Sequence, residues 1–314
     1  MMSDGVLVLV DCLGFRGIWR RCEPQQLIDK LVSLETIAAK RIIPKYSATE
    51  LSYGKVRFHL RLLSDTVALS VQYEPIPGKT PSERQKNLLV SIACESAALL
   101  SKLFIDDDAV PLLLRGCISF GQHLCQSNFL VGPAVDEAAE YMNEPEGAFI
   151  WLLPSAASRH AEFLKDSANM LKHISDRALE RIFTFLEQKG LREVAELRRQ
   201  SKTWTPEHWR AIRQLFLHVL HGPNVVESYP LPVKRSPFID AAVINPLAFG
   251  NTVSERHRMI RLYELFLQGD RIDIWVKRQN TLKFLAAADE AVSTFHSEIK
   301  TGETPRKILE FLES

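Results

Sequence analysis

The sequence lacks an excess of charge of either sign. Its 314 residues include 39 lysines and arginines against 38 aspartates and glutamates, for a formal net charge of +1 at pH 7. Such a balance provides no field that would steer the whole protein onto nucleic acid or an anionic membrane. Any electrostatic function must therefore depend on a local cluster of charges.

The sequence also lacks a cysteine framework and a long apolar run. Its five cysteines are scattered and contain no C-x-x-C pair, so neither a set of disulfides nor a zinc site is indicated. No stretch approaches the roughly 20 apolar residues that a membrane helix needs. The early run from Val6 to Val10 lacks the length and the cleavage site of a signal peptide. We therefore expect reduced thiols and a cytoplasmic protein.

The first half of the sequence alternates predicted strands and helices. In "VLVLVDCLGF", residues 6–10 are all valine or leucine, which is typical of a central strand covered on both faces. Apolar residues then recur at helical spacing from Pro24 to just before Pro44. Residues 55–74 alternate with a period of two, which predicts two strands joined near Ser64 and Asp65.

The next segments complete an α+β pattern. They predict, in order, a helix, a strand, its hairpin partner, a short helix and a strand, over residues 88–103, 111–121, 127–132, 133–142 and 147–153. This order fits an α+β sandwich in which helices cover one face of a mainly antiparallel sheet.

The sequence changes character after Pro154. Residues 155–222 show helical periodicity with alternating charge, a proline-rich segment follows, and Asn280 or Thr281 could cap a final helix. We therefore expect two domains, a core over residues 1–155 and a helix-rich region over residues 156–314 that packs on it.

Two aspartates occupy similar places, Asp11 at the end of the first strand and Asp65 between two paired strands. If these strands are neighbours, the carboxylates converge, and two carboxylates within about 4 Å remain ionised most easily around a shared Mg²⁺ or Mn²⁺. Gly14 permits a tight turn that would present the N–H groups of Gly14, Phe15 and Arg16 to phosphates. The pattern suggests a nucleoside triphosphate held on two metal ions, although an isolated aspartate at a strand end more often caps a turn.

Four short motifs carry a resemblance to a known family. They are "DCLGF", "LLSDT", "RGCISFG" and "GPAVDEA", in that order. The series resembles the class III nucleotidyl cyclases over about residues 5–155. It is closer to the pyrimidine cyclases of bacterial anti-phage (Pycsar) systems. The segments "YPLPVKR" and "VKRQNTLKFL" also resemble the C-terminal part of these enzymes.

The resemblance implies a fold and a function. The fold would be a class III cyclase sandwich of the ferredoxin-like palm type with a helix-rich C-terminal extension, and residues 1–155 would be the catalytic core. Asp11, Asp65 and the carbonyl of Cys12 would hold two Mg²⁺ or Mn²⁺ ions. The substrate would be UTP, with CTP next, and the products a 3′,5′-cyclic monophosphate and pyrophosphate.

The resemblance also implies partners. Such enzymes are homodimers with composite active sites, and the cyclic nucleotide would activate a separate effector during phage infection. The chain itself would bind neither nucleic acid nor a membrane.

Base recognition differs from that of the purine cyclases, in which a lysine four residues before the second metal aspartate reads the base. Arg61 stands at this position, and Phe129 stands where its acidic or polar partner is expected. A purine would lose its hydrogen-bonding partners, at a cost of about 1–3 kcal/mol, so a pyrimidine is predicted. Tyr46 or Tyr53 could fill the space that a purine would take.

A second difference concerns the transition state. The resemblance places Asp136 and Glu140 where class III enzymes usually carry an asparagine and an arginine, and two acids cannot neutralise phosphate charge. Another cation must serve, and the candidates are Arg115, Arg61, Arg16, Lys234 and Lys277. Arg115 is preferred because it follows three leucines on a predicted central strand, where an unpaired guanidinium is costly.

Two other functions remain open. The two acids would suit a catalytically inactive, cyclase-like module that binds a nucleotide or a partner. A polymerase-like palm enzyme that makes a linear product or a dinucleotide could share the two metal aspartates.

Overall fold

The computed structural model describes residues 2–13, 15, 18, 22–41, 56–74, 76–105, 112–126, 129–172, 225–250, 252–267 and 271–300. By contacts, the chain divides into two compact units. The first combines Met1–Phe163 with Val225–Asp289, and the second combines Leu164–Asn224 with Glu290–Ser314. The predicted boundary at residues 155 and 156 stays a prediction, and the first unit includes a segment from beyond it.

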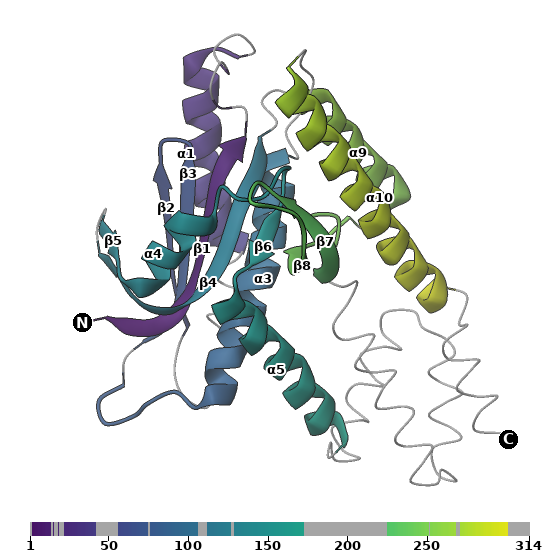
Figure 1. Ribbon diagram of the computed structural model, residues 1–314. Helices are drawn as coiled ribbons and strands as arrows, with labels where there is room; N and C mark the ends of the chain where they lie inside the picture. The colour runs from purple at the N-terminus through teal and green to yellow at the C-terminus, as the bar shows by residue number, and fades with distance from the viewer. Residues whose placement is uncertain are drawn as a thin grey trace, which may run out of the picture. The chain divides into compact units, whose positions relative to one another are not determined.

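The first unit is built on one mixed sheet (Figure 1). Its strands are β1 (Ser3–Leu13), β2 (Val56–Leu63), β3 (Thr66–Tyr73), β4 (Leu113–Gln126), β5 (Phe129–Val131), β6 (Ile150–Leu152), β7 (Val226–Val233) and β8 (Ser236–Ile244). They follow the order β2-β3-β1-β4-β6-β8-β7, and β5 pairs with β4 outside this path. Only the β4–β6 pair is parallel among these strands. The predicted α+β class with a mainly antiparallel sheet is confirmed.

The first half of the unit has the ferredoxin-like connectivity. Between its strands lie the helices α1 (Pro24–Arg41) and α3 (Glu83–Ile105), in the order β1-α1-β2-β3-α3-β4. The corresponding strand order is β2-β3-β1-β4, which is that of a split βαβ sandwich. The predicted palm-type topology is therefore present in the strand order itself.

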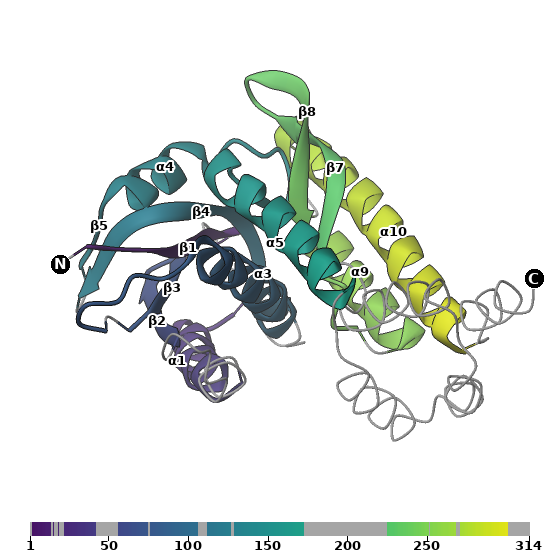
Figure 2. The same cartoon turned by 90° about the horizontal axis from the view of Figure 1, so that it is seen from below.

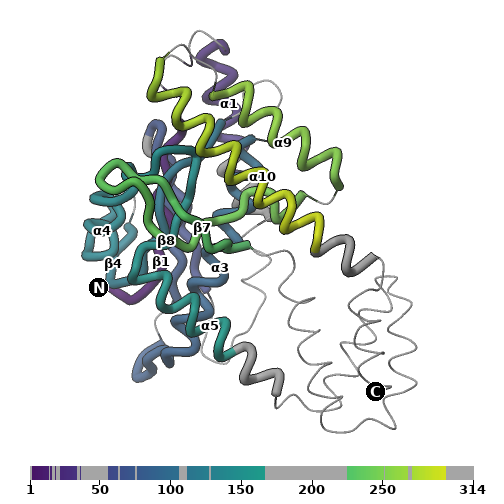
Figure 3. Tube along the Cα trace, turned by 45° about the vertical axis from the view of Figure 1, so that its right-hand side comes forward, coloured from purple at the N-terminus to yellow at the C-terminus, as the bar shows by residue number. Residues whose placement is uncertain are grey.

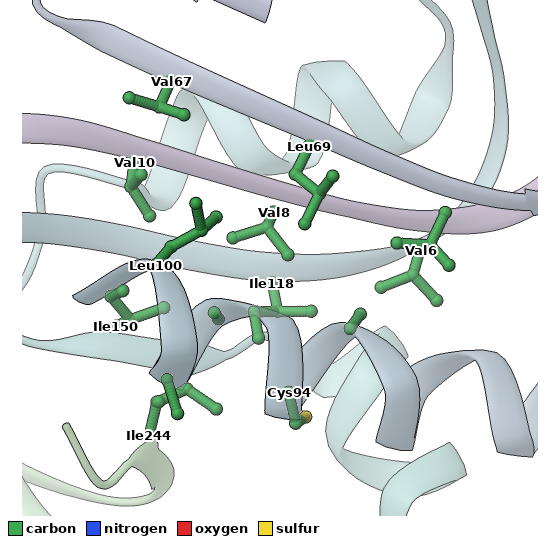
Figure 4. Packing of buried hydrophobic residues seen from close by; sticks show 14 of the residues in the cluster. Val6, Val8, Val10, Val67, Leu69, Cys94, Leu100, Ile118, Ile150 and Ile244 are labelled. Carbon is green, nitrogen blue, oxygen red and sulfur yellow. The ribbon is translucent and has the colours of Figure 1, made fainter. Parts of the chain in front are cut away.

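One face of the sheet carries a cluster of apolar side chains under α1 and α3. Val6, Val8 and Val10 of β1 point toward this layer, where they contact side chains such as Leu100 of α3 (Figure 4). Neighbouring strands supply Leu69 and Ile118 to the same cluster.

The opposite face is also covered by helices. These are α4 (Pro133–Tyr141), α9 (Val253–Phe266) and α10 (Ile272–Lys300). Their side chains Ala138, Met259 and Phe284 form a second cluster with Leu7 and Leu9 of β1. Figure 2 shows the sheet between α4 on one side and α1 and α3 on the other.

The prediction that helices cover one face only was therefore wrong. Both sets of alternate side chains on β1 are apolar, and each needs its own layer to exclude water.

The segment after residue 155 contributes strands as well as helices. The proline-rich stretch forms the β7–β8 hairpin, which joins the sheet through β6. Helices α9 and α10 lie side by side (Figure 3). Two side-chain hydrogen bonds join them, one from Arg256 to Asp289 and one from Arg278 to Glu264. Helix α5 (Pro154–Lys172) opens the predicted helical stretch, whose remainder lies outside the described residues.

The expected cap of the final helix was wrong. Helix α10 begins at Ile272, so Asn280 and Thr281 lie in its interior. Their side chains bind the backbone of a loop instead, at Glu146 and Ala148. The polar residues that looked like a helix start are tertiary contacts.

One helix is more apolar than we expected. Over its most apolar window α3 has a mean hydropathy of 1.8, so it is long and apolar enough to cross a membrane by length and composition alone. Two thirds of that window (67%) is buried inside the protein, as in a core helix. The five cysteines form no disulfide, in agreement with the sequence.

Candidate active site

Asp11 and Asp65 meet at one end of the sheet. Asp11 is opposite Thr66 of β3, and Asp65 stands in the tight turn that joins β2 to β3. Ser64 in this turn has a φ of 61°, a left-handed conformation that lets the chain reverse within two residues. The N–H of Cys12 donates to the carbonyl of Asp65 at 2.8 Å, which ties the turn to β1. The predicted convergence of the two aspartates is therefore present.

The electrostatics of Asp11 reflect this neighbour. Burial raises the pKa of its carboxyl, and the negative charge of Asp65 raises it further. The guanidinium of Arg115 acts in the opposite direction, since its Nη2 lies 3.5 Å from Oδ2 of Asp11. One cation thus partly balances two adjacent acids.

Arg115 stands opposite Asp11 on β4 and is nearly buried. Its Nη2 donates to Oδ1 of Asn143 at 2.6 Å, whereas its Nε is buried without a hydrogen-bond partner. Burial lowers the pKa of the guanidinium, and the charge of Asp11 opposes this effect. Sequence reasoning missed Asn143, because its place in an irregular turn carries no motif.

The donor set at this end of the sheet fits a divalent cation. Two carboxylates and the Cys12 carbonyl supply oxygen ligands, which Mg²⁺ and Mn²⁺ prefer. Burial raises the pKa of the Cys12 thiol to about 12, so the side chain stays neutral and only the backbone oxygen is available. No group of three or more His, Cys, Asp or Glu side chains arranged for a metal occurs in the described ranges. Water and substrate oxygens would therefore have to complete the coordination.

The predicted phosphate turn is described only at Phe15. Gly14 and Arg16 lie outside the described residues. The N–H of Phe15 donates to the Cys12 carbonyl at 3.3 Å, so this amide closes a turn rather than pointing freely outward. A carbonyl oxygen has two lone pairs, so Cys12 keeps one for a cation.

Of the predicted base-reading residues, the structure describes Arg61 and Phe129, and it does not bring them together. Arg61 lies on β2, opposite Ala68, and its Nη1 donates to the carbonyl of Leu60 at 2.9 Å. Phe129 is 73% exposed and begins β5, at the opposite end of β4 from Arg115. Tyr46 and Tyr53 lie outside the described residues. Their roles stay predictions.

The two acids that replace the usual transition-state residues point away from the sheet. Asp136 and Glu140 are exposed and one turn apart on α4, whereas Ala134 and Ala138 are the buried residues of this helix. Gly132 before the helix has a φ of 133°, and a Cβ there would overlap the backbone of Gln122 and His123. Helix α4 is thus held against β4 with its acids outward.

Of the candidate cations from the C-terminal half, Lys277 is affected by the charge of Arg115. Burial lowers the pKa of Lys277 on α10, and the nearby charges of Arg115 and Lys234 lower it further. Asp273 and Glu146 act in the opposite direction. The arrangement therefore combines two acids suited to a cation with several bases suited to an anion.

One cavity lined by described residues lies away from this site. It has a volume of about 250 Å³ at the N-terminal end of β1, and its lining includes Ser3, Asp4, Tyr73, Lys79 and Gln122. None of the predicted site residues lines it, so it does not belong to the candidate site.

Comparisons with known proteins were made by family model, by sequence and by structure. No protein-family model and no curated protein matches the chain. Among solved structures it is similar to the monomeric guanylyl cyclase domain of the RhoGC fusion protein from the aquatic fungus Blastocladiella emersonii. The identity is 14%, with 51% of this chain and 86% of that chain covered and a TM-score of 0.38.

Two further solved structures are similar to the chain. One is the catalytic core of a rhodopsin-guanylyl cyclase with converted specificity in complex with ATPalphaS, at 14% identity, with 50% of this chain and 80% of that chain covered and a TM-score of 0.38. The other is the adenylyl cyclase CyaB from P. aeruginosa, at 16% identity, with 52% and 83% covered and a TM-score of 0.35.

Proposed function

We propose that the protein is a nucleotidyl cyclase. It converts a pyrimidine nucleoside triphosphate, UTP in preference to CTP, to the 3′,5′-cyclic monophosphate and pyrophosphate. The observation that supports the proposal is the meeting of Asp11 and Asp65, joined by the hydrogen bond from the Cys12 N–H to the Asp65 carbonyl. The order of the four sequence motifs that surround these aspartates supports a cyclase among the possible metal-dependent enzymes.

The residues have distinct tasks in this reaction. Asp11, Asp65 and the Cys12 carbonyl would hold the Mg²⁺ or Mn²⁺ ions. When bound, such ions make the ribose 3′ hydroxyl more acidic and neutralise phosphate charge. The 3′ oxygen displaces pyrophosphate from the α-phosphorus, and one proton is released. Arg115, anchored by Asn143, provides fixed positive charge beside the reacting phosphate.

The preference for a pyrimidine depends on the residues that replace the purine-reading pair. Phe129 has no polar side-chain atom with which to bind a base. It begins β5, beside the end of β4 that is opposite to Arg115. A composite site in a homodimer, with the base held by Arg61 and Phe129 of the second subunit, accommodates this separation. In this proposal Tyr46 or Tyr53 fills the space that a purine would take.

The proposed biological role follows from the resemblance to the Pycsar enzymes. The cyclic nucleotide acts as a second messenger in anti-phage defence and activates a separate effector in the cytoplasm.

The test is an assay of the purified protein with each of the four ribonucleoside triphosphates and Mn²⁺, with products identified by mass. We expect cyclic UMP as the main product. Asp65→Asn should lower the rate by at least about 100-fold, because the carboxylate that would hold the ions is lost. The matched control is Asp4→Asn, an acid at the other end of β1 that pairs with Lys86 at 2.9 Å and should keep wild-type activity. An Asp65→Asn variant with normal activity would remove the site assignment.

A second candidate is a cyclase-like module that binds a nucleotide or a partner without turnover. The exposed acids Asp136 and Glu140 on α4 favour it, because neither can stabilise phosphate charge. Absence of product from all four nucleotides would support this module. A linear or dinucleotide product would instead support the polymerase-like palm enzyme.

A further inference from the structure

The loop between α4 and β6, residues 142–149, contacts three segments that are distant in sequence. Asn143 accepts the hydrogen bond from Arg115 of β4. The carbonyl of Glu144 accepts from the backbone N–H of Lys234, at the tip of the β7–β8 hairpin, at 3.1 Å. This loop therefore brings a base of the core and a base of the C-terminal region to one place.

Helix α10 is anchored to the same loop. Nδ2 of Asn280 donates to the Glu146 carbonyl at 2.9 Å, and the N–H of Ala148 donates to Oγ1 of Thr281 at 2.9 Å. Gly147 between them has no room for a Cβ, which would lie 2.9 Å from the Thr281 hydroxyl and closer still to Phe149. Helix α10 therefore packs closely on the loop, and backbone groups of the loop take part in both hydrogen bonds.

Lys277 stands one turn before these anchors. Residues three and four apart share a helix face, so Lys277 projects from the face of α10 that carries Asn280 and Thr281. The loop that holds these anchors also binds Arg115 and the backbone of Lys234, and the charges of both bases lower the pKa of the half-buried Lys277. Three bases from β4, the β7–β8 turn and α10 thus converge beside Asp11.

The neighbouring acids balance this group only in part, since Asp273 and Glu146 raise the pKa of Lys277 but burial and the nearby bases keep it lowered, and Asp11 lies 3.5 Å from Arg115. Asp273, one turn before Lys277, is held by two contacts from Arg271 at 3.0 and 3.1 Å. Within the described ranges, Lys277 and Lys234 form no ion pair, and the buried Nε of Arg115 has no hydrogen-bond partner. Gathering three bases with incomplete partners is unfavourable in the free protein, and it becomes favourable when a polyanion binds.

We propose that Lys277 and Lys234, together with Arg115, form a polyphosphate-binding site within a single chain. The assignment to the triphosphate of the substrate depends on the proposed cyclase function, whereas the binding of a polyphosphate does not. Lys277 and Lys234 lie outside the ferredoxin-like half of the molecule. The site therefore gives the C-terminal region a direct part in substrate binding, and it supplies the positive charge that Asp136 and Glu140 cannot.

The test measures binding of inorganic tripolyphosphate to the full-length protein by calorimetry, without divalent ions. Lys277→Gln keeps a polar, unbranched side chain but removes its charge, and it should weaken binding about tenfold, as expected for one lost charge-assisted phosphate contact. Lys277→Arg should restore binding, and Lys234→Gln should weaken it about threefold. The matched control is Lys283→Gln, an exposed lysine on the same helix, which should bind as the wild type does.

The outcomes separate this proposal from the proposed function. If Lys277→Gln and Lys283→Gln bind tripolyphosphate equally well, the site is overturned, whether or not the wild type makes a cyclic nucleotide. If binding depends on Lys277 but no nucleotide is converted, the polyphosphate site stands and the cyclase assignment fails. If polyphosphate binding depends on Lys277 and the wild type also makes a cyclic nucleotide, Lys277→Gln should raise the KM for the nucleotide more than it lowers kcat. Should Lys277→Gln fail to fold, the Lys234→Gln arm decides, and wild-type binding there would overturn the site.

Discussion

The two faces of the central sheet differ in what their alternate side chains do. On the face toward α1 and α3, β1 and β3 present apolar residues such as Val8 and Leu69, except at the N-terminal end of β1, where Asp4 pairs with Lys86 of α3. On the face toward α4 and α10, the same strands present Asp11 and Ser70, and β4 adds Arg115 and His123 among apolar neighbours. Because consecutive side chains point to opposite faces, one strand can stabilise the fold with one set and carry charge with the other.

The polar residues of the second face are held in place by specific bonds. Ser70 and His123 lie 2.7 Å apart between Oγ and Nε2, and Nε2 of Gln72 donates to the His123 carbonyl at 3.0 Å. Oγ of Ser119 donates to the Ala134 carbonyl at 2.7 Å, which fixes α4 on β4. The second face therefore depends on directional bonds where the first depends on packing.

The largest effect on stability is expected on the apolar face. Leu100→Ala removes a side chain that is 1% exposed and should lower the free energy of unfolding by about 2–5 kcal/mol. Urea unfolding measures this, and Leu265→Ala, at a position 55% exposed, is the control with a change within about 0.5 kcal/mol. The turnover per folded molecule should not change. A small loss for Leu100→Ala would contradict the assignment of stability to this face.

A smaller loss is expected on the polar face. Ser70→Ala leaves Nε2 of His123 buried without its partner, which should cost about 1–3 kcal/mol of unfolding free energy. The exposed Ser158→Ala is the matched control and should be neutral in the same measurement. Equal stabilities of the two variants would mean that the buried bond contributes nothing.

Acidification should weaken the polar face selectively. Burial lowers the pKa of His123, and the nearby His59 lowers it further, against the effect of the Gly121 carbonyl. The stability that neutral His123 provides is present above its ordinary pKa of about 6.5 and is lost as the pH falls toward the lower folded value. The free energy of unfolding should change by at most about 1.4 kcal/mol per pH unit through the titration of this one group.

The measurement is the free energy of unfolding between pH 7.5 and 5 for the wild type and His123→Gln. A flatter profile is expected in the variant, and part of the slope should remain because burial also lowers the pKa of His59. Superimposable profiles would exclude His123 as the source.

The smallest stability change is expected at the paired aspartates. Burial and Asp65 raise the pKa of Asp11, so its favourable contribution to stability is present at low pH and is lost as the pH rises through the folded value. Without metal, Asp65→Asn should therefore raise the free energy of unfolding at pH 7 by about 1 kcal/mol or less and leave it unchanged near pH 3. Thermal unfolding at the two pH values tests this. Destabilisation at pH 7 would mean that the turn needs the carboxylate for folding.

Much of the fold could be predicted because its signals are local. Valine and leucine alternate without a polar break from Val6 to Val10, and the two-residue turn at Ser64 and Asp65 interrupts a clear period of two. The corrections arose where a residue acts through a distant partner. Asn280 and Thr281 have the chemistry of a helix cap, but loop 142–149 takes their hydrogen bonds.

The candidate site divides in the same way. Asp11 and Asp65 could be named from their places at strand ends, and Arg115 because it follows three leucines on a predicted central strand, where a charged residue stands out from its apolar neighbours. Asn143 could not be named, and Lys277 was one of several lysines, because the partner of each is set by how α4, β6 and α10 meet.

The sequence by itself determined which segments become strands and helices, and which charged residues lie at their ends, because periodicity and turn chemistry act over a few residues. Tertiary structure alone decided that Asp11 on β1 lies beside the turn that carries Asp65, and that β4, the β7–β8 hairpin and α10 contact the same loop. Such meetings depend on strand order and loop contacts between residues far apart in the chain, and no local pattern encodes them.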